Sequence, residues 1–185
     1  MNPRKILLIG GGVRSGKSSF AVELGLQLGE RRAFIATATR SDDEMEARID
    51  RHQLDRRNAF TTVEEPRALA DALEALAEHD VVVVDCLTHW LSNLLIAKVP
   101  QEEILKQVDS VVTVLQKRAF HAVLVTNEVG MSIHPPTALG RAFVEICGFA
   151  HQRFARAADE VHLAVLGTTL RIKPAADARL ALGVS

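Results

Sequence analysis

Aromatic residues are scarce in this 185-residue sequence, where they make up 4% and tyrosine is absent. A hydrophobic core must therefore rest on Val, Leu, Ile and Ala, which dominate a hydrophobic fraction of 48%. Neither charge is in marked excess, because the formal net charge is −1 at pH 7. That balance argues against a general nucleic-acid-binding protein, which needs a basic face to displace counterions from phosphates. It still allows one basic pocket for a single anionic ligand.

Cysteines and long apolar runs are also rare. The two cysteines, Cys86 and Cys147, lie in apolar surroundings, which favours buried free thiols in a reducing compartment. The N-terminus leads into an apolar run at 6–9, which is too short for a signal-peptide core or a membrane span. We therefore expect a cytoplasmic protein without a membrane span.

Short apolar runs alternate with segments of helical periodicity, a pattern typical of an α/β fold with a mostly parallel sheet. The run of four valines at 81–84 suits a central strand that is covered on both faces. The expected strands are 6–9, 33–37, 61–63, 81–85, 122–126, 161–166 and 169–172, the last two paired around Gly167, and the expected helices are 18–28, 42–57, 66–78, 87–97, 102–118 and 137–158. Since no repeat, low-complexity tract or linker is present, residues 1–185 are predicted to form one domain, with a weakly patterned tail at 174–185.

A glycine-rich segment after the first expected strand matches the phosphate-binding pattern G-x-x-x-x-G-K-[ST] without a mismatch. Its glycines let backbone N–H groups turn toward phosphates, and the N-terminus of the next helix adds its dipole. Lys17 can then bridge the outer phosphates, and Ser18 can ligate Mg²⁺. A strand before and a helix after the segment disfavour a chance glycine-rich turn, so we predict a three-layer fold of the P-loop NTPase type. The loop consists of Gly11, Gly12, Val13, Arg14, Ser15, Gly16, Lys17 and Ser18.

Two acidic residues end later strands. Asp85 closes the strand at 81–85 and suits a partner of Mg²⁺, directly or through water, although it can also simply cap the next helix. Glu128 follows the strand that ends at Thr126 and is a weaker candidate, since ligands bind at the carboxyl ends of strands in open α/β sheets. The segment at 126–130 reads TNEVG, which is not the N-K-x-D loop of guanine-recognising switch proteins. Base preference therefore does not follow from these residues.

One histidine, His52, falls on the helix expected at 42–57. There it shares a side with Met45, Ile49 and Arg56, at steps of four, three and four residues. A neutral imidazole is a competent nucleophile near pH 7. Spacing alone nevertheless favours a surface or interface histidine without a chemical role. The six other histidines lack metal-ligand spacing and are interpreted as structural or solvated.

Five segments occur in a fixed order along the chain. They are GGVRSGKS at 11–18, IAT at 35–37, DEMEARIDRH at 43–52, VTNEVGM at 125–131 and ADEV at 158–161. Together they resemble the bifunctional adenosylcobinamide kinase/adenosylcobinamide-phosphate guanylyltransferase family of cobalamin biosynthesis, over roughly residues 6–173. The phosphate loop is generic, whereas the histidine segment and the TNEVGM run are specific to the family.

The resemblance implies two reactions at one nucleotide site. A nucleoside triphosphate first phosphorylates the hydroxyl of the aminopropanol arm of adenosylcobinamide. GTP then loses pyrophosphate as its GMP moves onto a histidine, and the GMP passes to the cobinamide phosphate to give adenosyl-GDP-cobinamide. His52 matches that histidine, which reverses the interpretation from spacing. The implied ligands are GTP, ATP, Mg²⁺ and a corrinoid, and the implied assembly is a homotrimer.

The resemblance also implies a set of nucleotide contacts. It carries them over to the loop at 11–18 and to Ala36, Thr37, Ala38, Gln53, Leu54, Asp55, Arg56, Glu64 and Asp85. The sequence departs from the family pattern at Asp85, where relatives can have Glu, and after His52, where QLDR stands in place of a segment that can contain Lys and Gly. Two alternatives stay open: a single-activity P-loop small-molecule kinase with a structural His52, and a nucleotide-dependent switch ATPase or GTPase.

Overall fold

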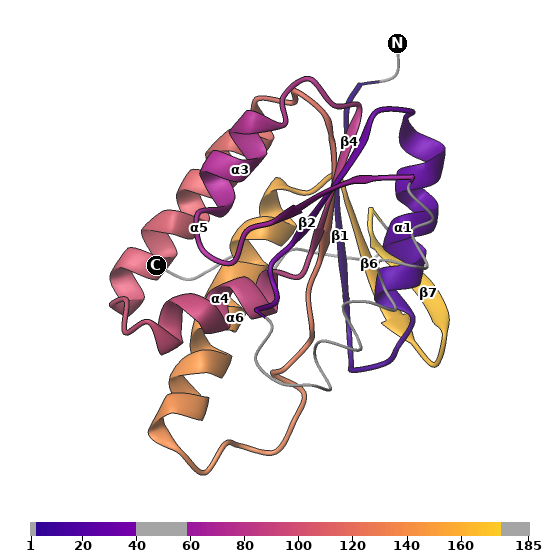
Figure 1. Ribbon diagram of the computed structural model, residues 1–185. Coiled ribbons are helices and arrows are strands. Elements are labelled where there is room, and N and C mark those ends of the chain that lie inside the picture. Colours follow the sequence, from indigo (N-terminus) through magenta and orange to yellow (C-terminus); the bar gives the residue numbers. More distant parts are fainter. Residues whose placement is uncertain (1–2, 40–58, 175–185) are drawn as a thin grey trace.

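A computed structural model describes residues 3–39 and 59–174 of the chain. Within these ranges, seven strands form one sheet in the order β3-β2-β4-β5-β1-β6-β7 (Figure 1). All neighbouring strands run parallel except β6 and β7, which are antiparallel. The strands are β1 (Ile6–Gly11), β2 (Arg32–Ala36), β3 (Thr61–Glu64), β4 (Val81–Asp85), β5 (His121–Val125), β6 (Glu160–Val165) and β7 (Thr168–Lys173).

The inner strands are apolar on both faces because helices cover both faces. In β1, Ile6 and Leu8 belong to one hydrophobic core, and Leu7 and Ile9 belong to the other. The four valines of β4 divide between the two cores in the same alternating way. Because successive residues of each strand point into one core or the other, these segments are continuous apolar runs, as expected for buried parallel strands.

The described helices cover the two faces of the sheet unequally. Helix α1 (Lys17–Leu28) lies on one face, as Figure 1 shows, whereas four helices pack on the other. These four are α3 (Leu69–Ala75), α4 (Leu87–Ile96), α5 (Gln101–Gln116) and α6 (Ala138–Ala157). The core beneath the four helices is the larger one and includes the buried Trp90 of α4. The predicted three-layer α/β fold with a mostly parallel sheet is confirmed.

Most predicted elements are found within about two residues of their expected ends. The helix expected from Pro66 is an exception, since α3 begins at Leu69 and ends earlier than expected, at Ala75. The Pro66 carbonyl accepts a hydrogen bond from Asn93 Nδ2 at 3.1 Å, and the Arg67 carbonyl accepts one from Trp90 Nε1 at 2.8 Å. Helix α4 thus takes the acceptors that a first turn of α3 would have used. The helix expected at 42–57 lies outside the described residues.

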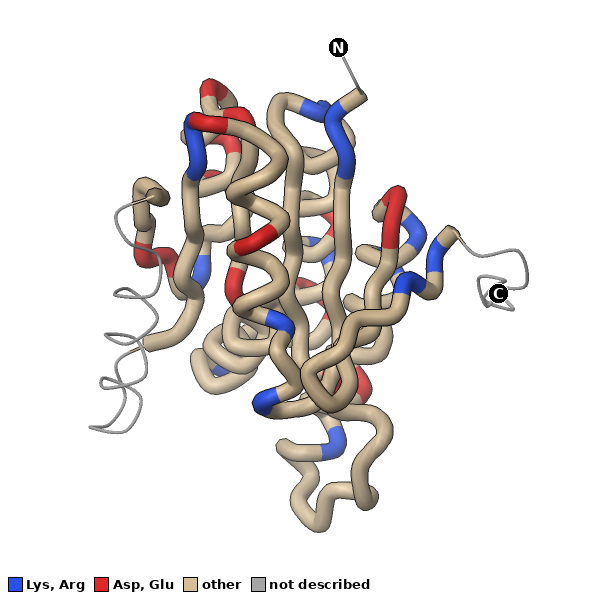
Figure 2. Tube along the Cα trace, turned by 90° about the vertical axis from the view of Figure 1, so that its right-hand side faces the viewer, with Lys and Arg blue, Asp and Glu red and all other residues tan. Residues whose placement is uncertain are grey.

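Charged residues are spread over the molecule. Figure 2 shows Lys and Arg residues interspersed with Asp and Glu residues at both ends of the sheet. In the described part of the chain, no helix is both long and apolar enough to cross a lipid bilayer.

Candidate nucleotide-binding site

The carboxyl ends of the five parallel strands β1 to β5 meet at one edge of the sheet, where open α/β folds bind their ligands. The glycine-rich loop at 11–18 follows β1, and the segment 36–38 ends β2. Glu64 ends β3 and Asp85 ends β4. The fold therefore gathers these candidate residues at one edge. The other candidates, His52, Gln53, Leu54, Asp55 and Arg56, lie outside the described residues.

Two positions of the loop require glycine. Gly11 has a φ of 151°, and a Cβ built there would lie 2.3 Å from the carbonyl oxygen of Ala164 on β6. Gly16 has a φ of 96° and directly precedes α1. Both backbone conformations disfavour any other residue. The glycines of the motif thus allow the tight passage from β1 into α1.

The side chain of Lys17 is held inside this loop. Lys17 is only 6% exposed, and its Nζ donates hydrogen bonds to the Gly12 carbonyl at 2.6 Å and to Ser15 Oγ at 3.3 Å. No side chain caps the N-terminus of α1, so its first N–H groups and its dipole are available to an anion. A buried ammonium group beside a helix N-terminus is an arrangement that binds phosphate.

A buried threonine joins the ends of β2 and β4. Thr37 Oγ1 donates to the carbonyl of Cys86 at 2.7 Å and accepts from its N–H at 2.8 Å. The Thr37 N–H donates to the Asp85 carbonyl at 3.2 Å, and Asn93 Nδ2 donates to the Thr37 carbonyl at 2.8 Å. The Thr37 hydroxyl thus has two backbone partners and fixes the residue after Asp85, while a nucleotide contact of Thr37, implied by the family resemblance, stays a prediction.

A second polar network supports the end of β5. Thr126 Oγ1 lies 2.6 Å from His151 Nε2 on α6 and 3.4 Å from Thr88 Oγ1 on α4. Thr88 Oγ1 also accepts a hydrogen bond from the N–H of Asn127 at 2.7 Å. Burial lowers the pKa of His151, so its imidazole is held neutral. Sequence reasoning missed this network, although a structural role for His151 was among its interpretations.

Both cysteines are buried and unpaired, as expected. Burial raises the pKa of Cys86 to about 11 and that of Cys147 to about 12. The nucleophilic form of cysteine is the thiolate, and these thiols therefore remain protonated and unreactive at neutral pH.

The donors proposed for Mg²⁺ are chemically suitable. Mg²⁺ prefers oxygen ligands and keeps several of its waters, and Ser18 offers a hydroxyl while Asp85 offers a carboxylate. Ser18 lies in the first turn of α1, and Asp85 is the last residue of β4. Over residues 3–39 and 59–174, no group of three or more His, Cys, Asp or Glu residues is arranged to hold a metal ion.

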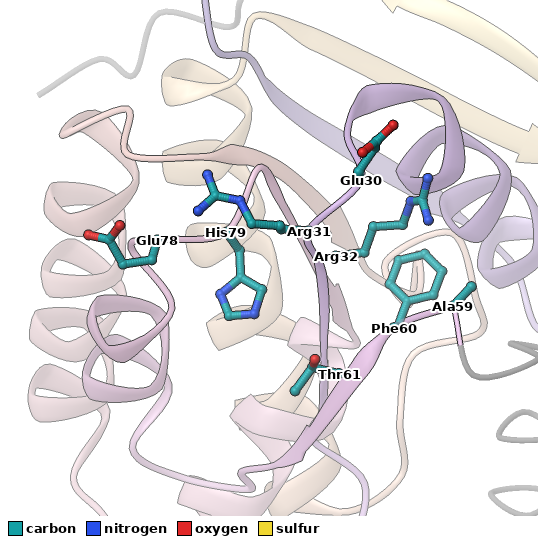
Figure 3. A pocket seen from close by; sticks show the side chains of 8 residues that line it. All are labelled: Glu30, Arg31, Arg32, Ala59, Phe60, Thr61, Glu78 and His79. Carbon is teal, nitrogen blue, oxygen red and sulfur yellow. The ribbon is translucent and has the colours of Figure 1, made fainter.

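A pocket of about 360 Å³ lies at the opposite edge of the sheet (Figure 3). Its lining comes from residues that precede β2, β3 and β4 and from the first residues of β2 and β3, not from residues that follow these strands. Arg31 at this pocket is engaged by Asp80, with Arg31 Nη2 2.9 Å from Asp80 Oδ1. The pocket is therefore separate from the edge that carries the glycine-rich loop. Its residues are Glu30, Arg31, Arg32, Ala59, Phe60, Thr61, Glu78 and His79.

A glycine-rich loop that leads from a central parallel strand into a helix, around a buried lysine, defines a nucleotide-binding protein of the P-loop class. Solved structures support the fold. The flagellar accessory protein FlaH from Methanocaldococcus jannaschii is similar with a TM-score of 0.52 and 14% sequence identity, over 91% of this chain and 76% of that chain. The KaiC-like protein PH0186 from Pyrococcus horikoshii OT3 is similar with a TM-score of 0.50 and 16% identity, over 87% of this chain and 71% of that chain.

Within that class, the chain belongs to the cobinamide kinase / cobinamide phosphate guanyltransferase family, whose model matches residues 7–172. It is 38% identical over 167 residues to the bifunctional adenosylcobalamin biosynthesis protein CobP of Pseudomonas aeruginosa, covering 90% of this chain and 96% of that protein. It is 37% identical over 181 residues to the corresponding CobU protein of Escherichia coli, covering 91% and 99%. The predicted family and the expected bifunctional enzyme class are confirmed, and neither the single-activity kinase nor the switch protein is supported.

Proposed function

We propose that this chain performs both family reactions at the edge of the sheet that carries the glycine-rich loop. In the first reaction, a nucleoside triphosphate phosphorylates the hydroxyl of the aminopropanol arm of adenosylcobinamide. In the second, GMP from GTP passes through His52 to the resulting cobinamide phosphate. The observation that carries the proposal is the buried Lys17 within a complete phosphate-binding loop, in a chain that aligns with bifunctional relatives over about nine tenths of its length.

The loop serves both reactions because each needs the triphosphate held and its charge neutralised. Backbone N–H groups of residues 11–18 and the ammonium of Lys17 bind the phosphates and stabilise charge on the departing group. Ser18 and Asp85 are the proposed ligands of Mg²⁺, which supplies further charge neutralisation when bound. Lys17 therefore has a role in both steps.

The nucleotidyl transfer needs a nucleophile that the loop does not contain. His52 is proposed for this role, because the family resemblance implies that it is the guanylylated histidine and a neutral imidazole is nucleophilic near pH 7. Its nitrogen bonds to the α-phosphorus of GTP and pyrophosphate leaves. The cobinamide phosphate then displaces histidine from the same phosphorus. Splitting one transfer into two displacements is the usual advantage of covalent catalysis.

The finer assignments belong to the same proposal. GTP is the proposed donor of GMP, and ATP or GTP is the proposed donor of the phosphate. Ala36, Thr37, Ala38 and Glu64 are the proposed further contacts of the nucleotide, together with the segment 53–56. The single domain, the homotrimer and the cytoplasmic location stay predictions.

Labelling with GTP tests the proposal directly. The protein is incubated with Mg²⁺ and GTP labelled at the α-phosphate, then denatured and separated from free nucleotide. We expect a protein-bound label that is labile to acid and stable to alkali, which His52→Ala abolishes. His79→Ala serves as a matched control, because His79 lies at the opposite edge of the sheet and should leave the label intact.

Kinase assays with cobinamide separate the two activities. Lys17→Ala is expected to lose both phosphorylation and labelling, whereas His52→Ala loses only the labelling. If wild-type protein binds GTP but carries no label, only the kinase part of the proposal would stand. Loss of the kinase activity in folded His52→Ala would contradict the proposed division of roles.

A further inference from the structure

Hydrogen bonds fix three consecutive residues, 126–128, of the turn that follows β5 and lies beside the glycine-rich loop. The side chain of Thr126 contacts His151 and Thr88, and the N–H of Asn127 donates to Thr88 Oγ1 at 2.7 Å. The N–H of Glu128 donates to the carbonyl of Gly11, the first residue of the loop, at 2.9 Å. Glu128 is thereby tied to the loop through its backbone.

Glu128 also lies between the two elements that are proposed to handle the triphosphate. β5 pairs with β1 on one side and with β4 on the other. In the two ladders, Val125 is level with Ile9 of β1 and with Asp85 of β4. Glu128 follows Val125 by three residues, and so it stands beyond the edge of the sheet, between the loop and the strand of Asp85.

One hydrogen bond orients the carboxylate of Glu128 and leaves its second oxygen available. One oxygen, Oε1, accepts a hydrogen bond from the Gly130 N–H at 2.6 Å. The other oxygen has no hydrogen-bond partner among the described residues. A half-buried carboxylate with one open oxygen at a phosphate-binding edge has the chemistry of a proton acceptor.

We propose that Glu128 is the proton acceptor of the phosphorylation step, an inference that rests on the proposed function. The oxygen of the acceptor hydroxyl bonds to the γ-phosphorus, and the bond from that phosphorus to the β,γ-bridging oxygen breaks. The hydroxyl proton passes to Glu128, and the nucleoside diphosphate leaves. Guanylylation of His52 and the attack of cobinamide phosphate involve no hydroxyl proton. Glu128 therefore acts in the first reaction alone.

Glu128→Gln is the decisive variant, because glutamine retains an oxygen that can accept from the Gly130 N–H but cannot accept the proton. The expected result is a fall of roughly 10²–10⁴-fold in kcat for cobinamide phosphorylation. The KM for the nucleotide and the labelling by GTP should both stay within about threefold of the wild-type values, because phosphate binding remains intact.

Glu145→Gln on α6 is the matched control and should leave both activities unchanged, since Glu145 is exposed on that helix and lies outside the loop, the turn after β5 and the end of β4. Glu128→Asp keeps a proton acceptor and should recover at least about tenfold in kinase kcat over Glu128→Gln.

Three results overturn the inference. They are kinase activity of Glu128→Gln within about threefold of wild type, an equal loss of kinase and labelling, and no recovery in Glu128→Asp. Failure of the proposed function would look different, because wild-type protein would then form neither phosphorylated cobinamide nor the histidine label.

Discussion

Replacing Thr37 with valine should destabilise the fold in a way that can be calculated from two hydrogen bonds. Valine keeps the shape of threonine but removes the hydroxyl that accepts from the Cys86 N–H and donates to its carbonyl. Thr37 is 0% exposed and Cys86 is 3% exposed, so water cannot easily replace the lost partner. Each buried backbone group left without a partner costs about 1–3 kcal/mol. The Cys86 carbonyl keeps the hydrogen bond from the Trp90 N–H at 3.2 Å, so the Cys86 N–H alone loses its partner, and we expect a loss of about 2 kcal/mol.

Thr37→Ser is the matched control, because it keeps the hydroxyl and removes only a methyl group. Its loss should be about 1 kcal/mol, as for the removal of other single buried methyl groups. Urea unfolding followed by circular dichroism gives both free energies of unfolding. A loss of about 2 kcal/mol corresponds to a fall in Tm of roughly 4–8 °C for a chain of this size. Equal stability of the two variants, within about 0.5 kcal/mol, would refute the role assigned to the hydroxyl.

Further predictions concern the loop, acid stability and the thiols. Gly11→Ala should lose more than about 1 kcal/mol, because its Cβ would collide with a carbonyl on β6, whereas Gly12→Ala, with open space around it, should unfold at the wild-type urea concentration. Asp159 has its pKa lowered, chiefly by a hydrogen bond from the Arg118 guanidinium, so it stabilises the fold above about pH 4 and loses this effect as the pH falls further. The urea midpoint of Asp159→Asn should therefore be lower than that of wild type at pH 7, and the difference should shrink toward about pH 2; a constant difference would contradict this. A thiol reagent such as DTNB should modify neither cysteine of the native protein and both after unfolding; rapid native labelling would contradict their burial.

The sequence predicted the parts of the fold that depend on contiguous patterns. Burial of both faces of β4 makes the run at 81–84 apolar throughout. The periodicity of the helical segments gave their positions to within about two residues in most cases. The turn at Gly167 correctly indicated the paired strands on either side of it. The loop at 11–18 was recognisable because all of its chemistry lies within eight consecutive residues.

Contacts between distant residues could not be predicted in this way. Thr37 and Cys86 are 49 positions apart, and nothing local to either residue indicates their two hydrogen bonds. Thr126 and His151 are 25 positions apart and meet only because α6 packs beside β5. The late start of α3 has the same origin, since the carbonyls of Pro66 and Arg67, which precede it, are bound by side chains of α4.

The unequal covering of the sheet also bears on how the molecule fluctuates. Local opening requires least free energy where an element has few buried apolar contacts, and among the described helices α1 covers its face alone and over the smaller core. Helix α1 is also the element that begins at Lys17. A nucleotide at its N-terminus would therefore stabilise the helix that opens most readily among those described, and the four-helix face would be left almost unaffected. Such a molecule registers the presence of its nucleotide mainly as a change in the rigidity of one helix.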